Sequence, residues 1–279
     1  MRLIFLGTGT SFGVPQIGCG CAVCHSPDPR DKRSRCGAVI EIDAPHGNLH
    51  ENPHGTPQTP VRLLIDTPPE LRLQLVAAGI ASVDAVLYTH EHADHIHGID
   101  DLRAITIHRP TPLPLYGEAA TLATLATRFP YVVDEHHRPS PGTTRPQGRP
   151  VPVTSGVPFE VQGVRVLPFS VPHGRASVTA YRIGDIGYVT DAKTLPPDAL
   201  EALAGVRVLV LNALLRHAHP SHLSIDEAIA MARRVGAERT YFTHLTHDNF
   251  HAALVAELPA GIAPAHDGLV VDLPERARS

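Results

Sequence analysis

The sequence contains no tryptophan, and aromatic residues of all kinds make up only 5% of its 279 positions. Aliphatic side chains must therefore build most of the core. The sequence also lacks any run of about 18 continuous apolar residues, so no transmembrane helix is expected. The first apolar run covers only residues 3–6, whereas a secretory signal needs an apolar stretch of roughly 7–15 residues. These absences predict a cytoplasmic protein with no membrane partner.

The sequence also has no excess of positively charged residues. The 24 lysines and arginines are outnumbered by 28 aspartates and glutamates, which gives a net charge of −4. Proteins that grip long nucleic acids usually present a basic face. The sequence also has no arm rich in glycine and lysine of the kind that holds long RNA. A small-molecule substrate is therefore expected in place of a long nucleic acid, and a homodimer is compatible with the sequence but not required by it.

Prolines, glycines and histidines are abundant instead, with 27, 22 and 19 copies. So many prolines and glycines predict numerous connections, and the stretches near 44–60 and 136–156 are expected to be irregular loops. Strand-like and helix-like segments are interleaved along the chain without an internal repeat of fixed period. The length suits a single α/β domain over residues 1–279.

Metal-binding side chains concentrate in one six-residue stretch, HEHADH, at residues 90–95. Alternate side chains of an extended chain point the same way, so His90 and His92 can face one ion. If the chain then turns into a helix, Asp94 and His95 face a neighbouring point. Imidazole and carboxylate ligands suit Zn, Mn or Fe.

A metal centre of this kind needs further ligands from other parts of the chain. Three polar residues each follow an apolar, strand-like run: His173, Asp191 and His244. Side chains just beyond strand ends commonly form functional sites. The sequence therefore predicts that these three residues join the HEHADH segment.

This order of ligands resembles the metallo-β-lactamase superfamily, as do the opening LIFLGTGTS and the LLIDT around Asp66. The resemblance implies an αβ/βα four-layer sandwich of two mixed sheets flanked by helices. It also implies two divalent ions, Zn or Mn, along one edge of the sandwich. It assigns His90, His92 and His173 to one ion, assigns Asp94, His95 and His244 to the other, and places Asp191 between them.

Three of the four cysteines form a second motif, with Cys19, Cys21 and Cys24 at C-x-C-x-x-C spacing. Close-set thiols in a reducing compartment favour a structural zinc over disulfides. The spacing alone leaves two candidates for the fourth ligand, Cys36 and His247. The motif resembles the branch of the superfamily typified by the phosphoribosyl cyclic phosphate phosphodiesterase of the carbon–phosphorus lyase pathway. That resemblance implies His247 as the fourth ligand and leaves Cys36 free.

The expected activity is hydrolysis of a small cyclic phosphate or nucleotide-like phosphodiester. Two ions a few ångströms apart can share a hydroxide as the nucleophile and offset charge on the phosphoryl oxygens. A general acid must then protonate the leaving oxygen. His222 is the candidate, because it precedes the helix expected over 225–235 and matches a histidine of the phosphodiesterase branch. We count His222 and the ligand Asp94 as the catalytic residues.

Other functions remain open at this level. A transfer RNA 3′-processing endonuclease of the same superfamily shares HEHADH, although the cysteine motif and the acidic balance count against it. A thioester or lactam hydrolase would have less use for His222. A non-catalytic metal-binding or cofactor-carrier protein is a further alternative, favoured only if one of the seven ligands points away from the others.

Overall fold

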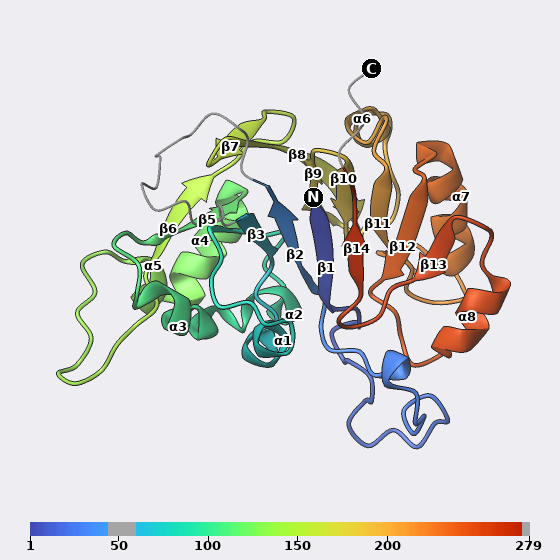
Figure 1. Ribbon diagram of the computed structural model, residues 1–279, viewed down its shortest axis with the longest axis horizontal. Helices are drawn as coiled ribbons and strands as arrows, with labels where there is room; N and C mark the ends of the chain where they lie inside the picture. The colour runs from blue at the N-terminus through green and yellow to red at the C-terminus, as the bar shows by residue number, and fades with distance from the viewer. Residues whose placement is uncertain (44–59, 275–279) are drawn as a thin grey trace.

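The computed structural model describes residues 1–43 and 60–274. Two seven-stranded sheets pack face to face, and helices cover the outer face of each sheet (Figure 1). The two sheets are mixed, as predicted, and the αβ/βα four-layer arrangement is confirmed. None of the described helices is long and apolar enough to cross a bilayer.

The first sheet is antiparallel at one side and parallel at the other. The pairs from β14 to β3 are antiparallel, and those from β3 to β6 are parallel. Its strands, in spatial order, are β14 (Val270–Asp272), β1 (Arg2–Gly7), β2 (Gly37–Ile42), β3 (Val61–Ile65), β4 (Ala85–Leu87), β5 (Leu113–Gly117) and β6 (Gly148–Pro152).

The second sheet has the same mixed design. The pairs from β13 to β10 are parallel, and those from β10 to β7 are antiparallel. Its strands, in spatial order, are β13 (Ile262–Pro264), β12 (Arg239–Thr243), β11 (Val208–Asn212), β10 (Ile186–Val189), β9 (Ala176–Ile183), β8 (Val164–His173) and β7 (Phe159–Val161).

Alternating side chains explain how each sheet separates two apolar layers. In β1, Leu3 and Phe5 enter the core between the sheets, whereas Ile4 and Leu6 pack against the helices of the first sheet. Successive side chains of a strand point to opposite faces, so a strand buried on both faces is apolar throughout. The short apolar runs of the sequence are therefore inner strands of a sandwich.

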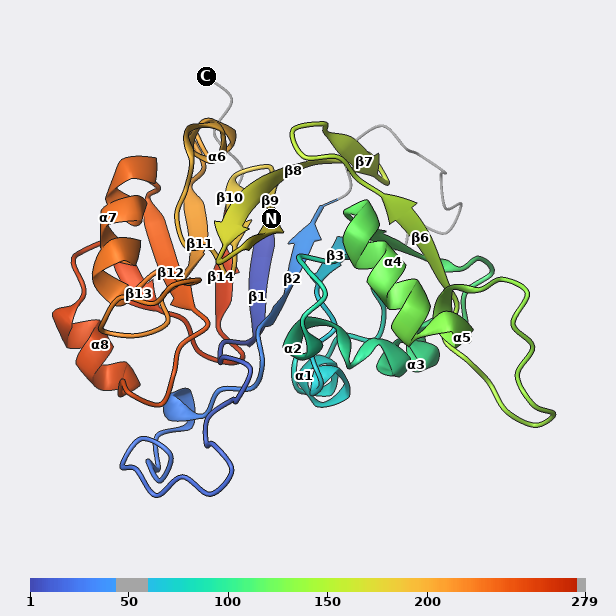
Figure 2. The same ribbon diagram turned by 180° about the vertical axis from the view of Figure 1, so that it is seen from behind.

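Short helices cover the outer faces (Figure 2). Those against the first sheet are α1 (Leu71–Ala77), α2 (Ala93–Ile96), η2 (Ile99–Leu102), α3 (Arg103–Thr106), α4 (Ala119–Arg128) and α5 (Pro130–Val133). Those of the second half of the chain are α6 (Pro197–Ala202), α7 (Ile225–Val235) and α8 (His251–Glu257). Ser224 is the N-cap of helix α7, and its hydroxyl accepts the Glu227 N–H in a capping box. Gly236, with a φ of 70°, is the C-cap.

The prediction of an irregular loop over residues 136–156 is partly wrong. Residues 136–156 include strand β6, which pairs in parallel with β5. Pro150 and Pro152 make this strand hard to recognise in the sequence. However, β6 lies at the edge of the sheet, and an edge strand tolerates proline because one side of its backbone pairs with no other strand. The other expected loop, near 44–60, lies outside the described residues except for Pro60.

A long connection between β1 and β2 extends from the sandwich and carries the cysteine motif (Figure 1). It contains the short helix η1 (Pro29–Asp31). The buried Arg33 ties this connection to the sandwich, because its Nη1 donates to Thr8 Oγ1 at 2.9 Å and to the Ala265 carbonyl at 2.7 Å.

Candidate metal centre

The HEHADH segment follows strand β4 and runs into helix α2. His92, the N-cap of α2, has an extended backbone, and Asp94 and His95 lie in the first turn of the helix. The change from strand to helix periodicity therefore points the first two histidines and the last two residues at different spots. This is the local geometry that the sequence predicts.

The first ligand group combines this segment with the second sheet. Ligand atoms of His90, His92, His173 and Asp191 all lie within 4.8 Å of one another. His173 ends β8, and its Nδ1 donates to the Ser221 carbonyl at 3.1 Å, so its Nε2 is free to face the group. His90 Nε2 and His92 Nδ1 are 2.9 Å apart and converge on the same point.

The second group lies beside the first and shares Asp191 with it. Ligand atoms of Asp94, His95 and His244 lie within 4.8 Å of one another. Asp191 Oδ2 is 3.7 Å from His90 Nε2 and 3.7 Å from His95 Nε2. Asp191 Oδ1 is 3.3 Å from His244 Nδ1. The carboxylate of Asp191 is therefore placed to bridge two neighbouring ions.

Two orphaned ring nitrogens show that these residues fit a metal. His95 Nε2 and His244 Nδ1 are buried and make no hydrogen bond, which is costly for a polar atom unless another ligand satisfies it. Burial also lowers the pKa of His244 to about 4 and holds that of His90 well below its usual value. Both rings are therefore neutral at physiological pH, which is the form that binds metals.

Asp66 orients the rings of His95 and His90 through hydrogen bonds, a role that we did not assign from the sequence. His95 Nδ1 donates to Asp66 Oδ2 at 2.7 Å, and the Thr89 hydroxyl donates to the same oxygen at 2.8 Å. His90 Nδ1 lies 3.0 Å from the Thr89 hydroxyl oxygen, whose hydrogen is already given to Asp66. One buried carboxylate thus fixes His95 directly and His90 through Thr89. The sequence signals are the LLIDT motif around Asp66 and its place after the buried strand β3, which parallels that of Asp191 after β10.

Three residues of the centre adopt left-handed backbone conformations. The φ angles are 61° for Asp66, 58° for Asp191 and 57° for His244. Asp66 and His244 directly follow strands β3 and β12, and Asp191 lies two residues beyond β10. Asn212 supports the turn after Asp191, because its Oδ1 accepts the Ala192 N–H at 2.7 Å. Such strain is tolerated where the surrounding structure holds it in place, typically at functional sites.

His222 lies at the open side of the centre. Its Nε2 donates to Asp191 Oδ2 at 3.3 Å, and its side chain is 12% exposed. It is also within ligand distance of His244 and Asp191. The structure therefore brings His222 to the centre, and the position suits either a proton donor or an additional ligand.

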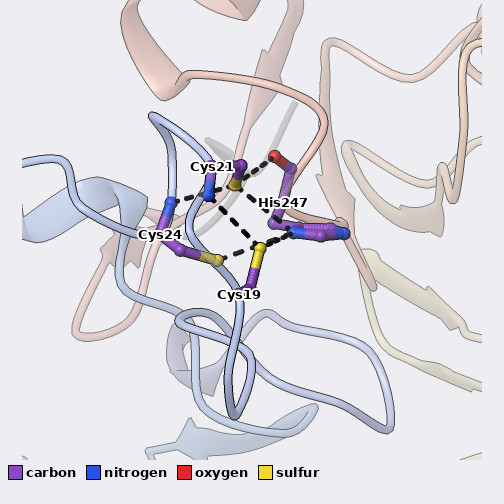
Figure 3. A group of neighbouring side chains, drawn as sticks. All are labelled: Cys19, Cys21, Cys24 and His247. Carbon is purple, nitrogen blue, oxygen red and sulfur yellow. Dashed lines mark hydrogen bonds between the residues drawn. The ribbon is translucent and has the colours of Figure 1, made fainter.

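The cysteine motif forms a separate cluster with His247 (Figure 3). His247 Nδ1 is 3.2 Å from Cys19 Sγ, 3.4 Å from Cys21 Sγ and 3.5 Å from Cys24 Sγ. With Zn–S near 2.3 Å and Zn–N near 2.0–2.1 Å, a tetrahedral site has sulfur-to-nitrogen edges of roughly 3.5 Å. The four side chains therefore fit one tetrahedral ion.

The fourth cysteine lies elsewhere. Cys36 is buried, its thiol donates to the Gly9 carbonyl at 3.1 Å, and its Sγ is 3.2 Å from Thr243 Oγ1. Burial raises its pKa to about 12. By contrast, the Cys24 N–H donates to Cys21 Sγ and lowers the pKa of that thiol to about 6, which favours the thiolate that zinc requires. Of the two candidates for the fourth ligand, the structure brings His247, not Cys36, to the cluster.

Lys193 is a second residue that the sequence analysis did not single out. Its Nζ donates to the two carboxylate oxygens of Glu227 at 2.7 and 2.8 Å and lies 3.4 Å from the His222 carbonyl. It thereby joins the turn after Asp191 to the start of α7, between which the His222 loop runs. A lone lysine four residues before helix α6 gives no signal of this in the sequence.

Comparisons with known proteins agree with this geometry. Residues 61–245 match the model of the β-lactamase superfamily domain. A protein of Porphyromonas gingivalis called octanoyltransferase is 39% identical over 99% of this chain, but the chain spans only 52% of that relative. Ribonuclease Z of a Mycobacterium species is 30% identical over 65% of this chain and 73% of its own length.

A crystal structure of a diphosphatase from the PhnP family is 36% identical to this chain. It has a TM-score of 0.84, and the match covers 98% of each chain. This likeness extends through the sandwich and the connection that carries the cysteines. The chain therefore belongs to the metallo-β-lactamase superfamily, where it lies close to the PhnP family.

Proposed function

We propose that this chain hydrolyses a phosphodiester or diphosphate bond in a small molecule, such as a cyclic phosphate or a nucleotide-like diester. The observation that carries the proposal is the convergence of seven ligand side chains with His222 at their open side. Similarity to a PhnP-family diphosphatase over nearly the whole chain supports the choice of phosphorus chemistry.

The proposed ligands are the two groups described above, with Asp191 shared. Two divalent ions, Zn or Mn, held there would supply a water ionised near neutral pH and offset negative charge on the phosphoryl oxygens. Asp66 and Thr89 keep the ligand rings in fixed orientations, so the centre is organised before the substrate arrives. Asp94 serves as a ligand beside His95, from which its Oδ2 lies 3.5 Å away.

His222 is the proposed general acid. The water attacks after it has lost a proton: its oxygen forms a bond to phosphorus, the bond from phosphorus to the leaving oxygen breaks, and His222 Nε2 gives its proton to that leaving oxygen. The position suits this role because the imidazole is partly exposed at the open side of the centre, where a leaving group can depart.

We also propose that Cys19, Cys21, Cys24 and His247 hold a structural zinc. The four ligands leave no open position for a substrate, as in closed structural sites. Such an ion would pin the long β1–β2 connection to the turn after β12. That turn also carries His244, so the zinc would support the catalytic centre through the backbone.

Leaving groups of different basicity test the role of His222. In His222→Ala, turnover of a methyl phosphodiester should fall by ~10²–10⁴-fold, because an alkoxide needs a proton to depart. Turnover of bis(p-nitrophenyl) phosphate should fall much less, because nitrophenoxide is a good leaving group. Equal losses on both substrates, together with loss of a metal ion, would make His222 a ligand instead of an acid.

A substrate panel tests the reaction class with the purified, metal-loaded protein. Cleavage of bis(p-nitrophenyl) phosphate and of 2′,3′-cyclic nucleotides, without cleavage of nitrocefin, is the expected result. Processing of precursor transfer RNA at a comparable rate would favour the alternative of a transfer RNA 3′-processing endonuclease. Inactivity on every substrate at full metal occupancy would favour a non-catalytic metal-binding or cofactor-carrier protein.

Hydrolysis of an acyl thioester is a second candidate. The observation in its favour is the 39% identity to the Porphyromonas gingivalis protein, which is named for octanoyl transfer. The matched part is about half of that protein, so the named activity can belong to its other half. Release of free thiol from octanoyl-glutathione by this chain would favour the thioester reaction over the phosphodiester reaction.

A further inference from the structure

Ser221 contacts both a proposed metal ligand and the proposed general acid. Its backbone carbonyl accepts a hydrogen bond from His173 Nδ1 at 3.1 Å, and its hydroxyl oxygen is 2.9 Å from His222 Nδ1. The tip of the β8–β9 hairpin also packs closely on it, because a Cβ added at Gly174 would be 3.2 Å from Ser221 Cβ. Ser221 therefore makes a short connection between the metal centre and the ring of His222.

His219 gives this connection a direction, because its Nδ1 is a hydrogen-bond acceptor. The Ser221 backbone N–H lies 3.3 Å from this nitrogen, and a backbone N–H can only donate. The same nitrogen accepts the Ser221 hydroxyl, whose oxygen is 3.2 Å away. The neutral ring of His219 therefore carries its proton on Nε2 and directs the lone pair of Nδ1 toward Ser221.

This direction decides which nitrogen of His222 keeps a proton. His222 Nδ1 is 2.9 Å from the Ser221 hydroxyl oxygen and 3.3 Å from His219 Nδ1. If His222 Nδ1 carried a lone pair, that lone pair would face the lone pair of His219, which is unfavourable. If it carries a hydrogen, it meets two acceptors. His222 Nδ1 therefore keeps its proton, and Nε2 is the nitrogen that exchanges one.

Nε2 of His222 is also the nitrogen that faces the metal centre, 3.3 Å from Asp191 Oδ2. A ring that has given away its Nε2 proton is left with a proton on Nδ1, and this is the form that Ser221 and His219 bind. The imidazolium form donates the same hydrogen bond more strongly, since it is charged. The two residues therefore suit His222 both before and after it gives up a proton, and the ring need not turn between these states.

We propose that Ser221 and His219 are positioning residues for His222: they keep the proton on its Nδ1 and direct its Nε2 at the leaving oxygen. The inference rests on the proposed function and adds to it two residues that act through His222. Their role differs from that of Lys193, which holds the backbone of the loop, because Ser221 and His219 contact the imidazole ring itself.

A double-mutant comparison tests whether Ser221 acts through His222. Ser221→Ala removes the hydroxyl but keeps the carbonyl that holds His173, so the metal content should not change. We expect kcat for a methyl phosphodiester to fall by about tenfold, with KM unchanged and a smaller loss on bis(p-nitrophenyl) phosphate. In His222→Ala, adding Ser221→Ala should cause no further loss, because the ring that Ser221 positions is gone. Losses that multiply in the double variant would overturn the inference.

Two substitutions of His219 test its acceptor nitrogen. In His219→Asn, the amide oxygen occupies the same place along the side chain as Nδ1 and can accept the Ser221 hydroxyl, whereas His219→Leu has no acceptor. Turnover of the methyl diester should be mostly retained in His219→Asn and should fall severalfold in His219→Leu. His217→Leu removes an exposed histidine from the same loop and should leave turnover unchanged. Equal losses in His219→Asn and His219→Leu would contradict the role of the acceptor.

Nitrogen NMR of the zinc-loaded protein tests the positioning without any turnover. When histidine is labelled with ¹⁵N in the ring, protonated and bare nitrogens have distinct chemical shifts. The signals of His222 are those missing from His222→Ala, and they should show a protonated Nδ1. Ser221→Ala should lower the protonated fraction at this nitrogen. A bare Nδ1 in the unaltered protein would overturn the inference.

These measurements separate the inference from the proposed function. If His222 Nδ1 is protonated in a way that depends on Ser221 while no phosphodiester is cleaved, the positioning stands and the reaction is wrong. If phosphodiesters are cleaved while His222 Nδ1 is bare, the reaction stands and the positioning is wrong.

Discussion

His244 and His247 are three residues apart on one turn, and they face two different clusters. His244 Nδ1 lies 3.3 Å from Asp191 in the catalytic centre, whereas His247 Nδ1 lies 3.2–3.5 Å from the three cysteine sulfurs. Leu245, between them, is fully buried, and its N–H donates to the Thr8 carbonyl at 3.0 Å. Because Leu245 anchors the turn, we expect a change at one cluster to affect the other.

Removing one zinc ligand should therefore affect both clusters. Cys21→Ser is expected to lose the tightly bound ion, to lower the melting temperature and to weaken the catalytic ion that His244 holds. Metal analysis by mass spectrometry and thermal unfolding measure these effects. Cys36→Ser is the matched control, because Cys36 is a buried cysteine outside the cluster, and it should keep all the metal. Full catalytic metal occupancy in Cys21→Ser would refute the coupling.

Asp66→Asn should weaken binding of the catalytic ions without touching a ligand. The carboxylate accepts three hydrogen bonds, from the Thr89 N–H, the Thr89 hydroxyl and His95. An amide must turn its NH₂ group toward one of these donors, which misorients His95. Loss of an outer partner of this kind typically costs roughly 10–100-fold in metal affinity. Competition with a chelator measures the change, and the ion proposed for the cysteine cluster should remain bound. An unaltered affinity would show that Asp66 does not orient the ligand.

Lys193→Met should misplace His222 while leaving the metal centre intact. Without the ion pair to Glu227, the loop before α7 keeps only the hydrogen bond from the Leu223 N–H to the Ala192 carbonyl, at 2.8 Å, as a direct tie to the turn after Asp191. We expect kcat to fall by about tenfold for alkyl diesters and by less for nitrophenyl diesters, because a misplaced general acid matters most for a poor leaving group. The metal content should not change. Lys193→Arg should restore part of the rate. Arg207→Met, which removes a cation paired with Glu238 far from the loop, should not change turnover. Equal losses on both ester types would indicate general loosening of the structure.

His251 should make the protein less stable in mild acid. Burial and the nearby Arg33 lower its pKa to about 4 in the folded chain, so the folded state holds the ring neutral. The unfolded chain binds a proton near the ordinary value of about 6.5. The stability that this residue contributes is therefore present above pH 6.5 and is lost as the pH falls from about 6.5 toward 4.

The size of this effect can be measured by difference. Urea unfolding of the metal-free protein at pH 7.5 and pH 5 should show a loss on the order of 1 kcal/mol that is missing in His251→Gln. Metal-free samples are needed because ligand protonation also releases ions in acid. The same pH dependence in both proteins would mean that His251 titrates equally in the folded and unfolded states.

The sequence by itself determined the ligands and the apolar strands. HEHADH places four candidate ligands within six residues, and strand ends mark His173, Asp191 and His244. The bounds of α7 follow from Ser224, Glu227 and Gly236, because capping is a local interaction between neighbours in the chain. These features depend on periodicity and spacing, which a sequence displays directly.

Only the tertiary structure decided the features that join distant segments. The selection of His247 over Cys36 depends on how the β1–β2 connection lies against the turn after β12. The role of Asp66 depends on a hydrogen bond to a residue 29 positions away. Strand β6 becomes visible only beside β5, since its prolines obscure the strand pattern. The hydrogen bond from His173 to the Ser221 carbonyl joins residues 48 positions apart, so no single stretch encodes it. Each of these features depends on contacts between residues that are far apart in the sequence. Local periodicity and spacing do not reveal such contacts.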